Sequence, residues 1–82
     1  MPRVVAVGSA ARAFTLGAAE IDVEASTVGA MIKTLDTLFP GFGEHIERRM
    51  AIAIDGEIHQ DASGAPLRPD TEVYLFPRIG GG

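Results

Sequence analysis

The 82-residue sequence predicts an α+β domain in which a mixed sheet of four or five strands carries one main helix across one face. Strand-like runs occur both before and after a single helical pattern, so strands from both parts of the chain can share one sheet. The helical pattern has one broad apolar stripe, which is typical of a helix that packs on a sheet. No internal repeat is found, and the length suits a single domain.

Two strands are expected before the helix. Residues 3–7 (RVVAV) are rich in β-branched side chains and end at a Gly-Ser pair. Residues 19–24 (AEIDVE) alternate between apolar and acidic side chains, which indicates a strand with one buried face. About ten residues separate the two runs, so we expect an antiparallel hairpin with a long loop.

The helix is expected to begin after Ser26 or Thr27, because either side chain can cap its first amides. Pro40-Gly41 should end it, since proline cannot continue a helix. Residues 41–48 are then expected to form a loop. The apolar residues of the stripe follow one another at spacings of three and four: Val28, Ile32, Leu35 and Phe39.

After the helix, residues 49–55 (RMAIAID) alternate large and small apolar side chains. The large ones should face the core, and the alanine face can lie under a helix or against another chain. Asp55-Gly56 is a strong signal for a two-residue hairpin turn, which returns the chain through a short strand at 57–59. A polar loop and a Pro69-Asp70 turn lead to the last strand, residues 72–76.

The last strand is apolar on both faces. Val73 and Leu75 share one face, and Tyr74 and Phe76 share the other. A strand covered by a helix on one face normally carries polar residues on the other. Two interpretations stay open: the aromatic face contacts a partner, or it covers the edge of a small core.

A glycine-rich tail follows this strand. Pro77 is expected to stop ladder pairing, because it has no amide hydrogen. The last four residues, Ile79 to Gly82, can extend about 13 Å at about 3.3 Å per residue. Glycines have no Cβ, so a narrow channel on another protein can enclose them and reach the terminal carboxylate. The alternative is an inert, disordered end.

Composition excludes several classes of function. The net charge is −4 and the basic residues are scattered, so a nucleic acid is not an expected partner. No run is long enough for a membrane span or a signal peptide, and a cytoplasmic location is expected. The chain has no cysteine, which excludes disulfides and thiolate chemistry on side chains.

Nothing in the sequence predicts an enzyme or a bound cofactor. His45 and His59 do not have the spacing of metal ligands. Serines 9, 26 and 63 lack the context of a hydrolase nucleophile, and no phosphate-binding glycine loop occurs.

The C-terminal stretch PLRPDTEVYLFPRIGGG resembles the signature of the MoaD/ThiS family of ubiquitin-like sulfur carriers. The stretches TVGAMIKTLDTLFPGF, IAIDGEI and ARAFTLGAAEIDVEAS are similar to the helix, the strand and turn, and the first loop and second strand of that family. The resemblance implies a β-grasp fold, with residues 1–77 as the domain and residues 78–82 as a flexible glycine tail.

The resemblance also implies a chemistry. Gly82 would be the reactive residue: a ubiquitin-activating-like enzyme would adenylate its carboxylate with ATP, and a thiocarboxylate formed there would donate sulfur to a synthase subunit. Arg78 departs from the small or apolar residue common at its position and resembles the tail arginines of ubiquitin. The residues that would contact the partners are Tyr74, Phe76, Pro77, Arg78, Ile79, Gly80 and Gly81.

The resemblance leaves the pathway open. Molybdopterin synthesis, with this chain as a non-catalytic small subunit, is the first expectation. Carriers for thiamine thiazole, for cysteine or for another sulfur-containing metabolite are alternatives, because the partner chooses the acceptor. Two other classes are a ubiquitin-like protein modifier and an interaction module with an inert tail.

Overall fold

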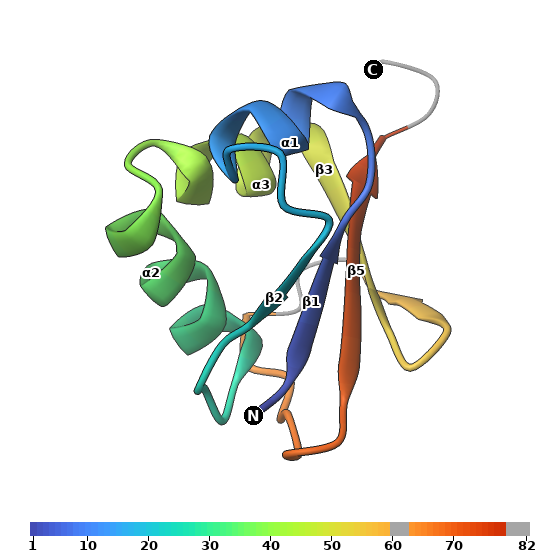
Figure 1. Cartoon of the computed structure of the whole chain (residues 1–82). Helices are drawn as coiled ribbons and strands as arrows, with labels where there is room; N and C mark the ends of the chain where they lie inside the picture. Colours follow the sequence, from blue (N-terminus) through green and yellow to red (C-terminus); the bar gives the residue numbers. More distant parts are fainter. Residues whose placement is uncertain (60–62, 79–82) are drawn as a thin grey trace.

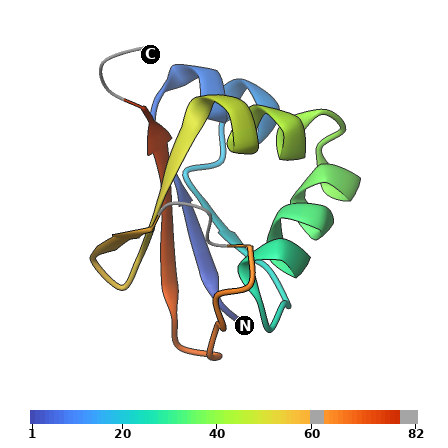
Figure 2. The same ribbon diagram turned by 180° about the vertical axis from the view of Figure 1, so that it is seen from behind.

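The computed structural model describes residues 1–59 and 63–78. In these parts of the chain a mixed sheet carries α2 and α3 on one face, while α1 lies at one end of the sheet (Figures 1 and 2). The elements in chain order are β1 (Arg3–Ala6), α1 (Ser9–Phe14), β2 (Glu20–Asp22), α2 (Val28–Leu38), α3 (Phe42–Arg49), β3 (Met50–Ile54), β4 (Glu57–His59) and β5 (Glu72–Pro77).

The sheet has five strands in the order β2-β1-β5-β3-β4. β1 and β5 are parallel, and the other neighbouring pairs are antiparallel. The predicted mixed sheet and both predicted hairpins are therefore confirmed. At the second hairpin, Asp55 and Gly56 have φ values of 47° and 88°, the left-handed conformation that a two-residue turn of this kind needs at both positions. The last strand in the sequence is the central strand of the sheet.

The prediction of a long loop between the first two strands was wrong in one respect, because this segment contains the short helix α1. Ala11 is 1% exposed and joins the core from this helix. The helix has only six residues and no side-chain cap at its first residue, so its apolar pattern is too short to be recognised in the sequence.

The prediction of a loop at residues 41–48 was also wrong, because α3 occupies most of it. Phe42 and Ile46 lie one turn apart and are both buried, at 0% and 1% exposure. The side chain of Asp36 accepts hydrogen bonds from the amides of Gly41 and Gly43, at 3.2 and 3.0 Å, and so replaces a capping residue at the start of α3. β3 consequently begins at Met50, one residue later than expected.

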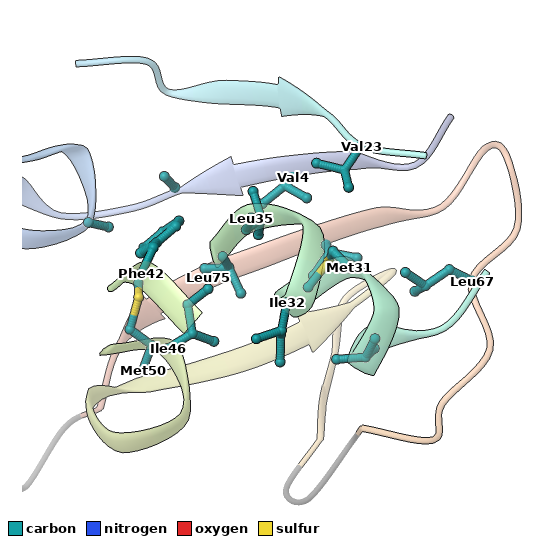
Figure 3. Packing of buried hydrophobic residues seen from close by; sticks show 14 residues of the cluster. Val4, Val23, Met31, Ile32, Leu35, Phe42, Ile46, Met50, Leu67 and Leu75 are labelled. Carbon is teal, nitrogen blue, oxygen red and sulfur yellow. The ribbon is translucent and has the colours of Figure 1, made fainter. Parts of the chain in front are cut away.

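The core lies between the sheet and the two longer helices (Figure 3). The predicted stripe of α2 is confirmed, except that Phe39 follows the helix and is half-buried. Thr27 is the capping residue: its hydroxyl accepts a hydrogen bond from the amide of Ala30 at 3.1 Å. The fully buried residues that contact one another include Val4, Val28, Met31, Leu35, Phe42, Val73 and Leu75.

Candidate functional site

β5 carries the chain to its C-terminal end and is paired on both sides. Its residues pair with β1 up to Ala6 opposite Leu75, and with β3 up to Met50 opposite Pro77. Val73 and Leu75 have no exposed surface. A strand that is held by two neighbours and buried on one face forms a rigid base for whatever follows it.

The aromatic face of β5 points away from the helices. Because side chains alternate along a strand, Tyr74 and Phe76 lie on the face opposite the buried Val73 and Leu75. Tyr74 is 38% exposed and Phe76 is half-buried. The sequence left open whether this face belongs to the core, and the structure places it outside the core formed by the described residues.

Neighbouring strands extend this face into an apolar surface. Ala53 and Ala51 lie opposite Tyr74 and Phe76, so the alanine face of β3 does not lie under a helix of the described chain. Val5 pairs with Tyr74 from the other side, and Ile58 pairs with Ala53 and is 68% exposed. We call this surface the open-face patch, and its residues are Val5, Ala51, Ile58, Tyr74 and Phe76, together with Ala53, which is only 8% exposed.

Pairing does not stop at Pro77, contrary to the expectation from sequence. The amide of Arg78 donates a hydrogen bond to the carbonyl oxygen of Arg49 at 3.1 Å. In an antiparallel pair, alternate residues exchange no hydrogen bonds with their partner. Pro77, opposite Met50, occupies such a position, so its missing amide hydrogen costs the β3–β5 ladder nothing.

Arg78 is bound to the body of the domain through its side chain as well. Its Nε donates to the carbonyl oxygen of Met50 at 3.0 Å, and one Nη donates to that of Glu47 at 3.1 Å. The latter carbonyl belongs to the last turn of α3, where backbone oxygens lack helical partners. Arg78 therefore satisfies acceptors at the end of α3 and fixes the chain through residue 78.

Gly8 brings a second segment against the same strand end. Its φ is +99°, and a Cβ built on it would lie 3.0 Å from Cγ of Pro77. The β1–α1 corner and the end of β5 are therefore in close contact. In the sequence, Gly8 indicates only the end of a strand, and its contact with Pro77 is not predicted by the residues around it.

Four of the predicted site residues lie outside the described residues: Ile79, Gly80, Gly81 and Gly82. The other four, Tyr74, Phe76, Pro77 and Arg78, are brought together by β5. The structure thus describes the surface next to the predicted reactive end.

Other side chains that could take part in catalysis or ligand binding have structural roles in the described chain. The ring of His45 lies 5.0 Å from that of Phe14 and 6.4 Å from that of Phe42. The buried hydroxyls of Thr15 and Thr71 both take part in hydrogen bonds to backbone groups.

Within residues 1–59 and 63–78, no group of three His, Cys, Asp or Glu residues could hold a metal ion. In the same residues, no helix has the length and apolar character needed to cross a bilayer.

The ThiS family pattern matches residues 8–82, which include the helices, β5 and the tail. The chain belongs to the ThiS family of ubiquitin-like sulfur carriers. A search of curated proteins found no match to this ThiS-family sequence.

Solved structures with low sequence identity share the fold. CysO of Mycobacterium tuberculosis, described as an antigen, has a TM-score of 0.84 at 18% identity, over 96% of this chain and 100% of that one. CysO of Amycolatopsis orientalis in its BexX complex has a TM-score of 0.83 at 16% identity, over 100% of both chains. The small archaeal modifier protein 1 of Methanosarcina acetivorans has a TM-score of 0.80 at 16% identity, over 99% of this chain and 95% of that one. The expected β-grasp fold with a five-stranded mixed sheet is confirmed.

Proposed function

We propose that this ThiS-family chain is a sulfur carrier whose reactive group is the main-chain carboxylate of Gly82. The observation that carries the proposal is the position of β5: the central strand of the sheet leads to the glycine tail beside an exposed apolar patch. A rigid base, a docking surface and a thin reactive end are the parts that a carrier needs. The chain itself supplies no catalyst in this proposal.

The chemistry follows from the weak reactivity of a carboxylate. An oxygen of the Gly82 carboxylate attacks the α-phosphate of ATP on a partner enzyme, and pyrophosphate leaves. A sulfide-level sulfur nucleophile then attacks the acyl carbon of the adenylate, AMP leaves, and a thiocarboxylate remains. No cysteine of this chain competes for the activated carbonyl, because the chain has none.

The open-face patch is the proposed docking surface for the partners. Tyr74 and Phe76 lie on the strand that continues into the tail, so a protein bound there lies next to the reactive end. Aromatic side chains on an exposed apolar patch are typical of protein interfaces. The structural neighbour from A. orientalis was solved with BexX, so this fold is compatible with partner binding. The partners proposed are a ubiquitin-activating-like enzyme and a sulfur-accepting synthase subunit.

Molybdopterin synthesis is the pathway that we propose first, with this chain as the non-catalytic small subunit of the synthase in the cytoplasm. Thiamine thiazole, cysteine or another sulfur-containing metabolite are alternative destinations of the sulfur. The fold is common to all of these, so a specific acceptor follows from the partner.

A second candidate function is that of a ubiquitin-like modifier. The observation that favours it is the likeness to a protein named a small archaeal modifier, at a TM-score of 0.80. In that case the activated carboxyl carbon of Gly82 would be attacked by a lysine amine, and an isopeptide bond would form. Conjugates of higher mass on denaturing gels would then accumulate in cells, whereas a carrier would give none.

The proposal is tested by ATP–pyrophosphate exchange with a ubiquitin-activating-like adenylating enzyme from the source organism. The full chain should support exchange, and a variant that lacks Gly81 and Gly82 should not. Tyr74→Ala should raise KM by about tenfold, because it removes an aromatic contact. The matched control is Leu16→Ala, since Leu16 is 89% exposed but lies outside the open-face patch. Equal exchange by the truncated and full chains would contradict the proposal.

A further inference from the structure

Three arginines are positioned at the end of the sheet where β5 ends, two by side-chain hydrogen bonds and one by its backbone. β1 and β5 are parallel and β3 is antiparallel to them, so Ala6 and Met50 lie at this same end. Nε of Arg12 donates to the carbonyl oxygen of Ala6 at 3.3 Å, and Nε of Arg78 donates to that of Met50 at 3.0 Å. Arg49 is joined to Arg78 through its backbone oxygen. We call Arg12, Arg49 and Arg78 the arginine collar, and Figure 1 shows α1, the start of β3 and the end of β5 at this end.

No carboxylate in residues 1–59 and 63–78 forms an ion pair with an arginine of the collar. The ion pairs found in residues 1–59 and 63–78 join Arg3 to Glu20 and Asp22, and Arg48 to Glu44. Arg12 and Arg78 donate instead to neutral backbone carbonyls. All three collar arginines are exposed, and their backbones lie at the same end of the sheet.

The acidic residues of α3 lie on a different side of that helix. Glu44 and Glu47 line a groove between α2 and α3 together with Lys33. At 3.6 residues per turn, Arg49 lies about 140° around the helix from Glu44 and about 160° from Glu47. These carboxylates therefore lie on a different side of α3 from Arg49.

Acidic residues gather at the opposite end of the sheet. β3 ends and β5 begins there, and the carboxylate of Asp55 accepts a hydrogen bond from the amide of Glu72 at 3.0 Å. The turn before β5 adds Asp70, and Glu24 follows β2. Two basic residues, Arg3, which pairs with Asp22, and Arg68, also lie toward this end. A chain with a net charge of −4 thus has a positive end, and that end is the one from which the tail continues.

We propose that the arginine collar docks on an acidic surface of the protein that receives the tail. This proposal rests on the proposed function, because it concerns the partner that holds Gly82. Ile79 to Gly82 span at most about 13 Å, so a protein that binds Gly82 in a reactive site brings its surface within reach of the collar. Carboxylates around the mouth of that site are the complement of three arginines.

The surroundings of the collar favour a protein over a nucleic acid. Val7 is 37% exposed, Pro77 is exposed and Phe76 is half-buried beside the arginines. Arginine with aromatic and apolar side chains is typical of protein interfaces. Three arginines on a net acidic chain release few counterions from a phosphate backbone.

The positive charge of the collar should act mainly on the rate at which the carrier associates with its partner. A positive end that faces an acidic site orients the approaching carrier with its tail forward and raises the association rate at low salt. The effect should weaken as salt shortens the Debye length, which is about 10 Å at 0.1 M.

The first test is an NMR titration of the full chain with poly-L-glutamate at low ionic strength. The inference predicts saturable shifts at the Arg12, Arg49 and Arg78 signals, and weaker binding by Arg49→Glu and by Arg12→Gln. Arg68→Glu is the matched control, because Arg68 is exposed near the start of β5 and its reversal changes the net charge equally. Absence of saturable shifts, or equal weakening by Arg68→Glu, would overturn the inference. Tighter binding of a short DNA duplex at equal charge concentration would also overturn it.

The second test is pyrophosphate exchange with the adenylating enzyme at several salt concentrations. Arg49→Glu should raise KM by about three- to tenfold at low salt with kcat unchanged, and the difference should shrink at high salt. Equal KM values for Arg49→Glu and Arg68→Glu would show the inference to be wrong. If the unaltered chain supported no exchange, the proposed function would fail, and the titration would still decide whether the collar binds acidic chains. Thermal unfolding of each variant separates lost docking from lost folding.

Discussion

Gly8 is the residue that brings the β1–α1 corner against the end of β5. Its φ of 99° and ψ of 153° lie in a region that residues other than glycine essentially never adopt. A Cβ at this position would also lie 3.0 Å from the Pro77 ring. We therefore predict that Gly8→Ala lowers the free energy of unfolding by about 2 kcal/mol or more, measured by urea denaturation.

Two comparisons separate the causes of this loss. Gly17 has a φ of +89° with nothing within 4 Å of a built Cβ, so Gly17→Ala should cost less, about 1 kcal/mol. In a double-mutant cycle, Pro77→Ala should recover part of the loss at Gly8, because the smaller side chain leaves room. Strict additivity of the two substitutions would contradict a contact between Gly8 and Pro77.

At the residue scale, the sequence predicted what each face of β5 contains but not where the faces point. Alternation alone separates Val73 and Leu75 from Tyr74 and Phe76. Which pair meets the helices depends on the register with β1 and β3, which is a long-range property. The hydrogen bonds of the Arg78 side chain are unpredictable for the same reason, because their acceptors are the carbonyl oxygens of Glu47 and Met50, about thirty residues away in the sequence.

At the scale of elements, the corner between α2 and α3 depends on one carboxylate. Asp36 sits in the last turns of α2 and accepts hydrogen bonds from Gly41 and Gly43. A Cβ on Gly43 would lie 3.0 Å from Cβ of Asp36, so the two helices are in close contact here. We predict that Asp36→Ala destabilises the domain by about 1–2 kcal/mol, measured by thermal and urea unfolding.

Asp36→Asn is the matched variant, because the amide oxygen can still accept both hydrogen bonds. It should cost less than about 1 kcal/mol, the value of a charge at a helix N-terminus. If Asp36→Asn and Asp36→Ala were equally destabilising, the hydrogen bonds at this corner would not be the cause.

The helix that could be predicted from the sequence has a longer apolar pattern than the two helices that could not. α2 has eleven residues and a continuous apolar stripe, so it could be recognised. α3 buries Phe42 and Ile46 in only eight residues that follow a Pro-Gly signal, and α1 has six residues. Short helices owe their stability to tertiary contacts, and a single sequence does not show those contacts.

At the scale of the whole molecule, stability resides in the core between the sheet and the helices. Leu35 has no exposed surface, whereas Leu38, on the same helix, is 55% exposed. We predict that Leu35→Ala lowers the free energy of unfolding by about 3 kcal/mol, through lost burial and a cavity. Leu38→Ala should cost less than about 0.5 kcal/mol. Urea denaturation of both variants measures the difference, and similar losses would contradict the core as described.

The division between a folded body and a reactive end gives a further prediction. The sheet and the core of the described residues, 1–59 and 63–78, are kept whole when Gly81 and Gly82 are deleted. The melting temperature should therefore stay within about 1 °C of that of the full chain, while all activation by the partner is lost. A large loss of stability in the truncated chain would mean that the tail is part of the fold.

The central claim is that sulfur is carried on the carboxyl end of the main chain. The most direct measurement is the intact mass of the protein after incubation with its adenylating enzyme, ATP and a sulfur donor, followed by fragmentation of the whole chain. We expect a mass increase equal to the difference between sulfur and oxygen, confined to fragments that contain Gly82. An unchanged mass in a reaction that consumes ATP at this chain, or sulfur located on any other residue, would contradict it.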